Sequence, residues 1–351
     1  MDREAKNPEV EVVSKRVLLI GGCGSMGSYL IPQLLELKYQ VDVATNVPGD
    51  LEAPNLRYLI TDARDLKNLA ELLANRYDGV IDFLDYNRMD YRKRHRLFLE
   101  KCGHYLYLSS YRVYYEAKGL TCEESPLQKD VHPDEEFRNS GDYSIYKAQN
   151  EETLRNSGFG NWTIVRPSIV FSRLSLPLVS LGAWAIWNRA MDHRPTLIPD
   201  CSLGVAATAT WSGDLAKLFA GVLFNPKCFG KTYTFATSEY HTWGEWAGFY
   251  RRLIGLETWT VGLSEFEDIY WNRAQWAVWQ LHYDRLFDRR MDNSKVLRDT
   301  GLAASDMTPV EKALEYEFSR LDRDYRFPGG EEVVQAMDRY LTNGGKILRK
   351  L

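Results

Sequence analysis

Short apolar runs alternate with helix-like patterns along the first half of the chain. The clearest run, Val17–Ile20, leads through a glycine-rich turn to apolar residues at helical spacing, Leu30, Leu34 and Leu35. Short apolar runs bounded by turn residues are typical of buried strands, and spacings of about three to four residues are typical of one helix face. Further strands are predicted at residues 40–45, 56–60, 77–84, 104–108 and 162–167, and helices at 91–101 and 143–155. This alternation predicts an α/β fold with a doubly wound parallel sheet.

The turn after the first predicted strand carries three glycines, Gly21, Gly24 and Gly27, at three-residue spacing. A glycine turn between a strand and a helix is typical of dinucleotide-binding βαβ units. The first glycine permits the tight turn, the second lets the backbone approach a pyrophosphate, and the third lets helix and strand pack closely. The N-terminus of the helix then offers free N–H groups to the phosphates. The alternative is a glycine turn that only closes a βα unit.

The end of the second predicted strand bears on the choice of dinucleotide. An acidic residue at this place binds the ribose 2′-hydroxyl of NAD, whereas a nearby arginine accepts the 2′-phosphate of NADP. Thr45 and Asn46 stand there instead. Because no arginine is present, we expect NAD, and NADP stays open.

Beyond Pro167 the alternation breaks and the pattern becomes helical and aromatic. We therefore predict two domains. A Rossmann-type, NAD(P)-binding domain is expected over residues 14–172, with residues 205–236 returning to it. A smaller, mostly helical substrate-binding domain is expected from residues 173–204 and 237–351.

Composition and charge argue against binding to nucleic acid or membranes and against a membrane-spanning or secreted protein. The 351 residues are 44% hydrophobic and carry a net charge of −4, so no basic field attracts nucleic acid or an anionic membrane. The longest weakly polar run, residues 174–187, is shorter than the roughly 20 residues that span a bilayer. Residues 1–15 mix charges without an apolar core, so we expect no signal peptide there. Five scattered cysteines without a Cys-x-x-Cys pair indicate free thiols in the cytoplasm and no metal site.

Candidate chemistry lies at the start of the helix predicted from residue 143. Tyr143 and Lys147 are four residues apart and therefore share a helix face. A free tyrosine has a pKa of roughly 10, and a nearby ammonium favours its phenolate and makes it usable as an acid or base. The spacing alone is more typical of a tyrosine stacked over an exposed lysine. Its place after a strand that ends in Ser109 and Ser110 favours the catalytic interpretation.

These motifs, in this order, resemble the extended short-chain dehydrogenases/reductases, the group that includes the NAD-dependent nucleotide-sugar epimerases and dehydratases. The glycine turn, the serine pair, the Tyr-x-x-x-Lys motif and Arg166-Pro167 carry the resemblance, which runs from about residue 16 to about residue 300. The turn at Asn46 and the strand Val80-Ile-Asp-Phe are similar to an atypical branch. That branch contains chloroplast stem-loop RNA-binding proteins and bacterial sugar-epimerase-like proteins.

The resemblance implies roles for individual residues. Tyr143 would be the acid/base, Lys147 would bind the nicotinamide ribose, and Ser110 would hydrogen-bond the reacting oxygen. Asp62 would reach the adenine, although capping of the next helix is an equal alternative. The implied cofactor-binding residues are Gly21, Gly24, Ser25, Met26, Gly27, Asn46, Asp62, Ala63, Leu84, Lys147, Pro167, Ser168 and Ile169.

Several positions depart from the pattern of that group. Dehydratases carry an acidic pair directly after the catalytic serine or threonine, where this chain has Tyr111 and Arg112, so dehydration is not expected. Asp85 and Tyr86 replace small residues after the fourth strand and predict a reshaped pocket near the nicotinamide. The candidate substrate-binding residues are Tyr111, Arg112, Trp211 and Arg285, with a surface location as the alternative for Arg285.

Together these features predict an NAD(P)-dependent epimerase or oxidoreductase that acts on a nucleotide-activated sugar through a transient keto intermediate. Two alternatives stay open. One is an NADPH-dependent ketoreductase of a non-sugar metabolite, and the other is a non-catalytic member that senses the cofactor or binds RNA. Relatives often form homodimers through the helices that correspond to residues 89–102 and 143–156, and the charge of the first leaves this state undecided.

Overall fold

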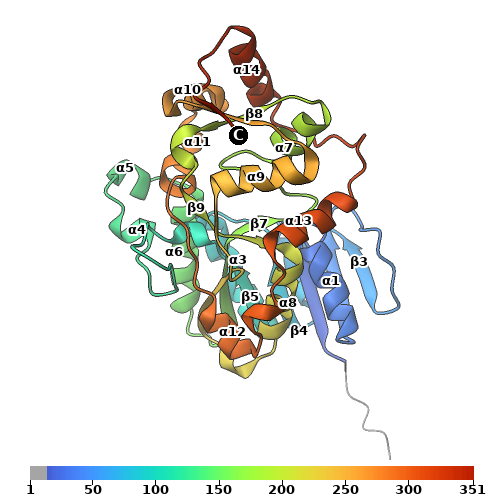
Figure 1. The fold of residues 1–351 in the computed structure, drawn as a ribbon. Coiled ribbons are helices and arrows are strands. Elements are labelled where there is room, and N and C mark those ends of the chain that lie inside the picture. The colour runs from blue at the N-terminus through green and yellow to red at the C-terminus, as the bar shows by residue number, and fades with distance from the viewer. Residues whose placement is uncertain (1–13) are drawn as a thin grey trace, which may run out of the picture.

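The computed structural model describes residues 14–351, and the expectation about a signal peptide lies almost wholly outside this range. A seven-stranded sheet forms the centre of the N-terminal half (Figure 1). Every neighbouring pair in it is parallel, which confirms the predicted fold class. Its strands, in spatial order, are β11 (Lys231–Phe235), β6 (Trp162–Pro167), β5 (Cys102–Leu108), β4 (Tyr77–Asp82), β1 (Arg16–Ile20), β2 (Gln40–Thr45) and β3 (Leu56–Ile60).

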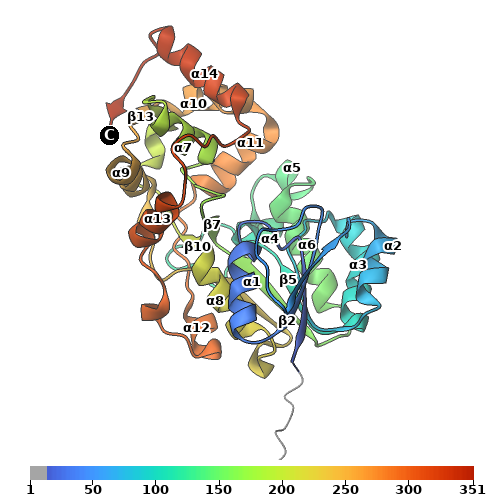
Figure 2. The same ribbon diagram turned by 90° about the vertical axis from the view of Figure 1, so that its right-hand side faces the viewer.

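Helices cover both faces of this sheet (Figure 2). On one face, Leu30 and Leu34 of α1 pack with Leu218 and Phe219 of α8 against the apolar strands. On the other face, Leu69 of α2 contributes to a separate buried cluster with residues of α3 and α6. The covering helices are α1 (Gly27–Glu36) and α8 (Ser212–Val222) on the first face, and α2 (Leu66–Leu73), α3 (Arg88–Lys101) and α6 (Tyr143–Arg155) on the second. Burial on both faces explains why these strands are continuous apolar runs.

The strand order reverses at β1, because β2 pairs with one of its edges and β4 with the other. In open α/β sheets, a crevice forms at the carboxyl ends of the strands where the order reverses, and ligands bind there. This reversal places the glycine turn after β1 beside the residues that follow β4.

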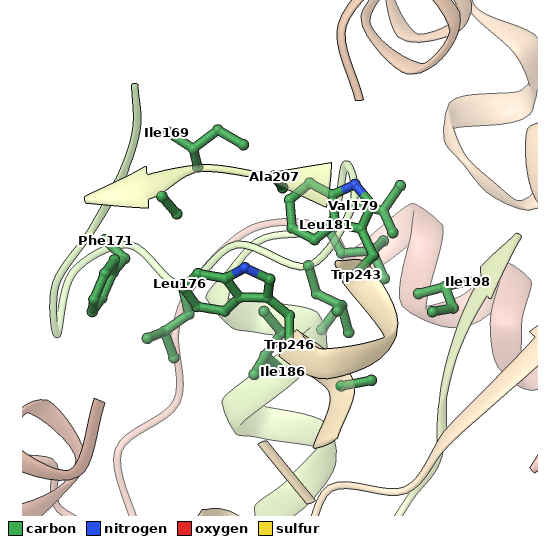
Figure 3. Packing of buried hydrophobic residues seen from close by; sticks show 14 of the residues in the cluster. Ile169, Phe171, Leu176, Val179, Leu181, Ile186, Ile198, Ala207, Trp243 and Trp246 are labelled. Carbon is green, nitrogen blue, oxygen red and sulfur yellow. The ribbon is translucent and has the colours of Figure 1, made fainter. Parts of the chain in front are cut away.

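The C-terminal half lies beyond the carboxyl ends of the sheet strands (Figures 1 and 2). Its helices are α7 (Ala183–Met191), α9 (Trp243–Ile254), α10 (Leu263–Ile269), α11 (Gln275–Gln280), α13 (Val310–Ser319) and α14 (Glu331–Thr342). Figure 3 shows Trp243 and Trp246 of α9, both buried, packing with Ile186 of α7 and with Leu176. This cluster is the core of the C-terminal half.

The C-terminal half also contains strands that the sequence pattern did not predict. A three-stranded sheet pairs β13 (Thr258–Val261) with β8 (Thr196–Pro199) and with β14 (Arg349–Lys350), near the end of the chain. These strands are too short to show a periodic pattern. In addition, α12 (Ser294–Thr300) packs against α8 and β11 of the Rossmann half, although it falls in the segment expected to bind substrate.

A buried carboxylate joins the two halves. Glu317 of α13 is fully buried and accepts hydrogen bonds from the Tyr29 hydroxyl of α1 at 2.5 Å and from the Arg173 amide at 2.8 Å. The indole of Trp211, at the end of β10 (Ala209–Trp211), donates a third. Because a buried carboxylate is costly unless it is hydrogen-bonded, these three donors fix α13 against the glycine-turn helix.

Candidate active site

The glycine turn has the shape that a bound phosphate requires. Gly21 adopts φ +71°, the left-handed conformation that favours glycine. A Cβ atom on Gly27 would lie 2.1 Å from the Gly22 carbonyl oxygen, so α1 packs directly on the turn. A Cβ atom on Gly24 would meet only the Gly21 carbonyl oxygen, at 3.8 Å, so space is open above Gly24.

No side chain caps the N-terminus of α1, which follows the glycine turn. Met26 is the N-cap residue of α1, and no side chain accepts a hydrogen bond from the end of this helix. The first turn of α1 contains no acidic residue. An uncapped helix N-terminus beside an open glycine turn fits the pyrophosphate of a dinucleotide. The Ser25 hydroxyl lies 2.7 Å from the Ser172 hydroxyl and 3.1 Å from the Ser212 hydroxyl, so it is already hydrogen-bonded within the protein.

A cavity of about 260 Å³ opens beside the turn. The two aspartates of the segment after β3 have different environments there. Asp65 caps α2 by accepting from the amides of Lys67 and Asn68, whereas Asp62 lies in the cavity wall and accepts from the Arg64 amide at 2.9 Å. The cavity brings together the cofactor candidates Gly21, Gly24, Asn46, Asp62, Ala63 and Leu84.

Arg64 also lines this cavity, and sequence reasoning missed it. The expectation of NAD considered an arginine for the 2′-phosphate only at the end of β2, where Asn46 stands. Arg64 follows β3 instead, and the parallel pairing of β2 with β3 brings both residues to the same edge of the sheet. Its position two residues after Asp62 is the signal that could have identified it.

A second cavity, of about 510 Å³, contains the candidate reacting groups. Tyr143 is the first residue of α6, whose N-cap Asp142 accepts from the Ser144 amide at 2.8 Å. Ser110 follows β5 and accepts from the Arg112 amide at 3.2 Å. Of the predicted site residues, Ser110, Tyr111, Arg112, Tyr143, Ser168, Ile169 and Arg285 line this cavity. Pro167 is buried at the end of β6 and precedes Ser168 directly.

Lys147 lies next to Tyr143. Its side chain is only 2% exposed, and its ammonium lies 5.5 Å from the centre of the Tyr143 ring. It donates to the Leu108 carbonyl at 2.9 Å and pairs with the Asp85 carboxylate at 3.0 Å. Burial alone would lower the pKa of Lys147, but Tyr107, Tyr143 and Asp85 outweigh burial and raise it. The lysine is therefore charged where it can stabilise a Tyr143 phenolate.

A buried ion pair positions α6 on the sheet. Glu151 of α6 accepts from Arg166 of β6 through Nε at 2.8 Å and Nη2 at 2.5 Å. The Ser109 hydroxyl donates to the same carboxylate at 2.5 Å, and Arg155 donates at 2.8 Å. Both Glu151 and Arg166 are buried, so this network fixes the helix that carries Tyr143 and Lys147. Sequence reasoning identified Arg166 only as part of a motif and missed Glu151.

Two arginines, Arg112 and Arg285, line the second cavity, and Arg112 also lies 3.7 Å from the Asp142 carboxylate. Tyr111 donates to Asp284 at 3.0 Å and accepts from Arg285 at 2.7 Å. The guanidinium of Arg112 lies 5.3 Å from the centre of the Tyr143 ring and 3.4 Å from Asp284, and Arg289 approaches the same carboxylate at 3.8 Å.

One buried carboxylate, that of Asp284, therefore faces three guanidinium groups. Among the described residues, those lining the cavity include Arg112 and Arg285 and no carboxylate side chain. This arrangement favours an anionic ligand. Arg285 is thus not a surface residue, and Asp284 is a further residue that sequence reasoning missed.

Trp211 does not join the other substrate candidates. It is absent from the lining of both cavities, and its indole contacts Tyr29 edge to face in addition to its hydrogen bond with Glu317. Within residues 14–351, no group of three or more His, Cys, Asp or Glu side chains could hold a metal ion. None of the helices in this range is long and apolar enough to cross a membrane.

No family model matches the chain, and no curated protein matches its sequence significantly. Solved structures resemble it in fold. WbmH of Bordetella bronchiseptica, in complex with NAD⁺, has 17% identity and a TM-score of 0.66 over 89% of this chain and 100% of that one. A UDP-glucuronic acid 4-epimerase of Bacillus cereus, in complex with UDP-glucuronic acid and NAD, has 15% identity and a TM-score of 0.64, covering 87% and 98%.

The UDP-glucose 4-epimerase of Thermus thermophilus, in complex with NAD, has 17% identity and a TM-score of 0.60, covering 87% of this chain and 98% of that one. These likenesses extend over nearly the whole length of the solved chains. At such identities they show that this chain has the Rossmann-type fold of these proteins.

Proposed function

We propose that this protein is an NAD(P)-dependent epimerase or oxidoreductase that acts on a nucleotide-activated sugar through a transient keto intermediate. The observation that carries the proposal is the arrangement of Ser110, Tyr143 and Lys147. Ser110 and Tyr143 line the second cavity, and the buried, charged Lys147 lies next to the tyrosine. The fold likeness to solved NAD complexes and the open glycine turn support a dinucleotide as the cofactor.

The residues divide the work between proton transfer, orientation and charge. When bound, the dinucleotide supplies the hydride acceptor and donor. Tyr143 takes the proton of a substrate hydroxyl and returns it, while Ser110 donates a hydrogen bond to the reacting oxygen. Lys147 stabilises the phenolate between these two transfers. Arg112 and Arg285 bind an anionic group of the substrate, for which the diphosphate of a nucleotide sugar is the proposed match.

Tyr143→Phe tests the acid/base assignment. We expect turnover to fall by roughly 10²- to 10⁴-fold, because the phenyl ring cannot move a proton, while dinucleotide affinity changes less than about twofold. The matched control is Tyr240→Phe, an exposed tyrosine outside both cavities, which should retain full activity. The assay is conversion of a panel of UDP-, dTDP-, GDP- and CDP-sugars. Full activity of Tyr143→Phe, or no conversion of any sugar by the unaltered protein, would overturn the proposal.

The second candidate is an NADPH-dependent ketoreductase, and Arg64 is the observation that favours it. A guanidinium in the cofactor cavity beside Asn46 can accept the 2′-phosphate of NADP. The dinucleotide released on denaturing the purified protein, identified by mass and absorbance, separates the candidates. Retained NAD favours the epimerase, whereas an empty protein whose NADPH affinity falls in Arg64→Gln, with NADH affinity unchanged, favours the reductase.

A further inference from the structure

Asp85, in the segment that follows β4, places a carboxylate against the two neighbouring residues Tyr146 and Lys147 of α6. One oxygen lies 3.0 Å from the Lys147 ammonium, and the other accepts from the Tyr146 hydroxyl. The lysine side chain is 2% exposed, whereas the Asp85 side chain is 44% exposed. The carboxylate therefore lies against the buried ammonium, and its own exposure leaves its remaining acceptor sites accessible.

Asp85 itself lines neither cavity, but residues next to it line both. Its neighbour Leu84 lines the glycine-turn cavity, and Tyr143, one helical turn from Lys147, lines the substrate cavity. The strand that it follows is paired with β1 where the strand order reverses. A dinucleotide that extends from the glycine turn toward Tyr143 passes this point.

We propose that Asp85 binds the nicotinamide-side ribose together with Lys147, its carboxylate accepting hydrogen bonds from the ribose hydroxyl groups. This inference rests on the proposed dinucleotide-dependent function. A carboxylate offers about four acceptor sites, and the contacts with Lys147 and Tyr146 use two. Acceptance of ribose hydroxyls by a carboxylate is the same chemistry by which acidic residues bind the other ribose in NAD sites.

The charge of Asp85 has a further consequence. An oxidised nicotinamide ring is positively charged and a reduced ring is neutral, so a fixed carboxylate nearby stabilises the oxidised form selectively. Removing this charge should therefore weaken binding of NAD⁺ more than binding of NADH. A residue that acted only on the fold would change both affinities alike.

The opposite role is also testable, because the carboxylate could instead compete with the ribose for Lys147. If Asp85 competed, its removal would free the ammonium and tighten dinucleotide binding. The sign of the change in affinity therefore decides between the two roles.

The test is Asp85→Asn in the full chain, with calorimetric dissociation constants for NAD⁺, NADH, ADP-ribose and ADP. We expect roughly a ten- to hundredfold loss for NAD⁺, as for a hydrogen bond to a charged group, and a smaller loss for NADH. ADP-ribose, which keeps the second ribose, should also bind more weakly, and ADP should bind unchanged. The control is Glu100→Gln, an exposed carboxylate of α3, which should leave all four constants unchanged.

A second variant, Tyr146→Phe, keeps the charge and removes one contact of the carboxylate, so it should lower NAD⁺ affinity less than Asp85→Asn. Equal or tighter binding of NAD⁺ by Asp85→Asn, or equal losses for NAD⁺ and NADH, would overturn the inference alone. Failure of the unaltered protein to bind any of the dinucleotides would overturn the proposed function as well.

Discussion

Replacement of Arg166 by methionine is expected to destabilise the protein strongly. The change keeps most of the side-chain volume but leaves the Glu151 carboxylate buried without the guanidinium that contacts both of its oxygens. Breaking a buried ion pair from one side costs about 3–5 kcal/mol. Because Ser109 and Arg155 still donate to Glu151, we expect about 3 kcal/mol. A loss of this size is a large part of the roughly 5–15 kcal/mol that stabilises a folded protein.

The assay is urea unfolding followed by circular dichroism, in a cycle with Glu151→Gln and the double variant. Because the double variant leaves no unpaired buried charge, its loss should be smaller than the sum of the single losses by about 2 kcal/mol. The control is Arg252→Met, which breaks the exposed pair with Glu311 and should cost about 1 kcal/mol or less. If Arg166→Met costs no more than this control, or if the two losses simply add, the reasoning is wrong.

The pH dependence of this difference follows from the carboxylate. Burial alone would raise the pKa of Glu151, but Arg166 outweighs burial and holds it below its ordinary value. The stability that the pair contributes is therefore present above the unfolded pKa of about 4.3 and is lost as the pH falls through the folded pKa. The difference in unfolding free energy between the unaltered protein and Arg166→Met should shrink below about pH 4.

Three further changes test other parts of the structure. Gly27→Ala should cost roughly 1–3 kcal/mol in urea unfolding, because its Cβ would lie 2.1 Å from the Gly22 oxygen; an unchanged midpoint would contradict this. His104 accepts from the Phe224 amide, and burial lowers its pKa to about 4, so stability should fall as the pH drops from about 6.5 to 4, and His104→Gln should lack this slope. Burial raises the pKa of Asp82 to about 7, so its contribution is lost as the pH rises through 7; Asp82→Asn should gain stability relative to the unaltered protein between pH 5 and pH 8, and no gain would refute this.

The local elements of this protein are predictable from its amino-acid pattern. The apolar run Val17–Ile20 forms a buried strand, the glycine turn has its left-handed residue at Gly21, and α6 begins at Tyr143. These features follow from backbone geometry and from periodic burial, which depend on residues near one another in the chain. The alternation of strands and helices was sufficient to predict the parallel sheet, because parallel strands need crossover helices.

Tertiary packing brings together groups from distant segments that no local pattern predicts. Asp85 lies against Lys147, Asp284 faces three arginines, and Arg64 lines the cavity beside the glycine turn. Tertiary packing also places Trp211 against Glu317 and outside both cavities. Such contacts join segments that are far apart in the chain, so the spacing of residues within one segment does not predict them. These contacts depend on how the elements pack, because burying a charge is costly unless the fold places a partner beside it.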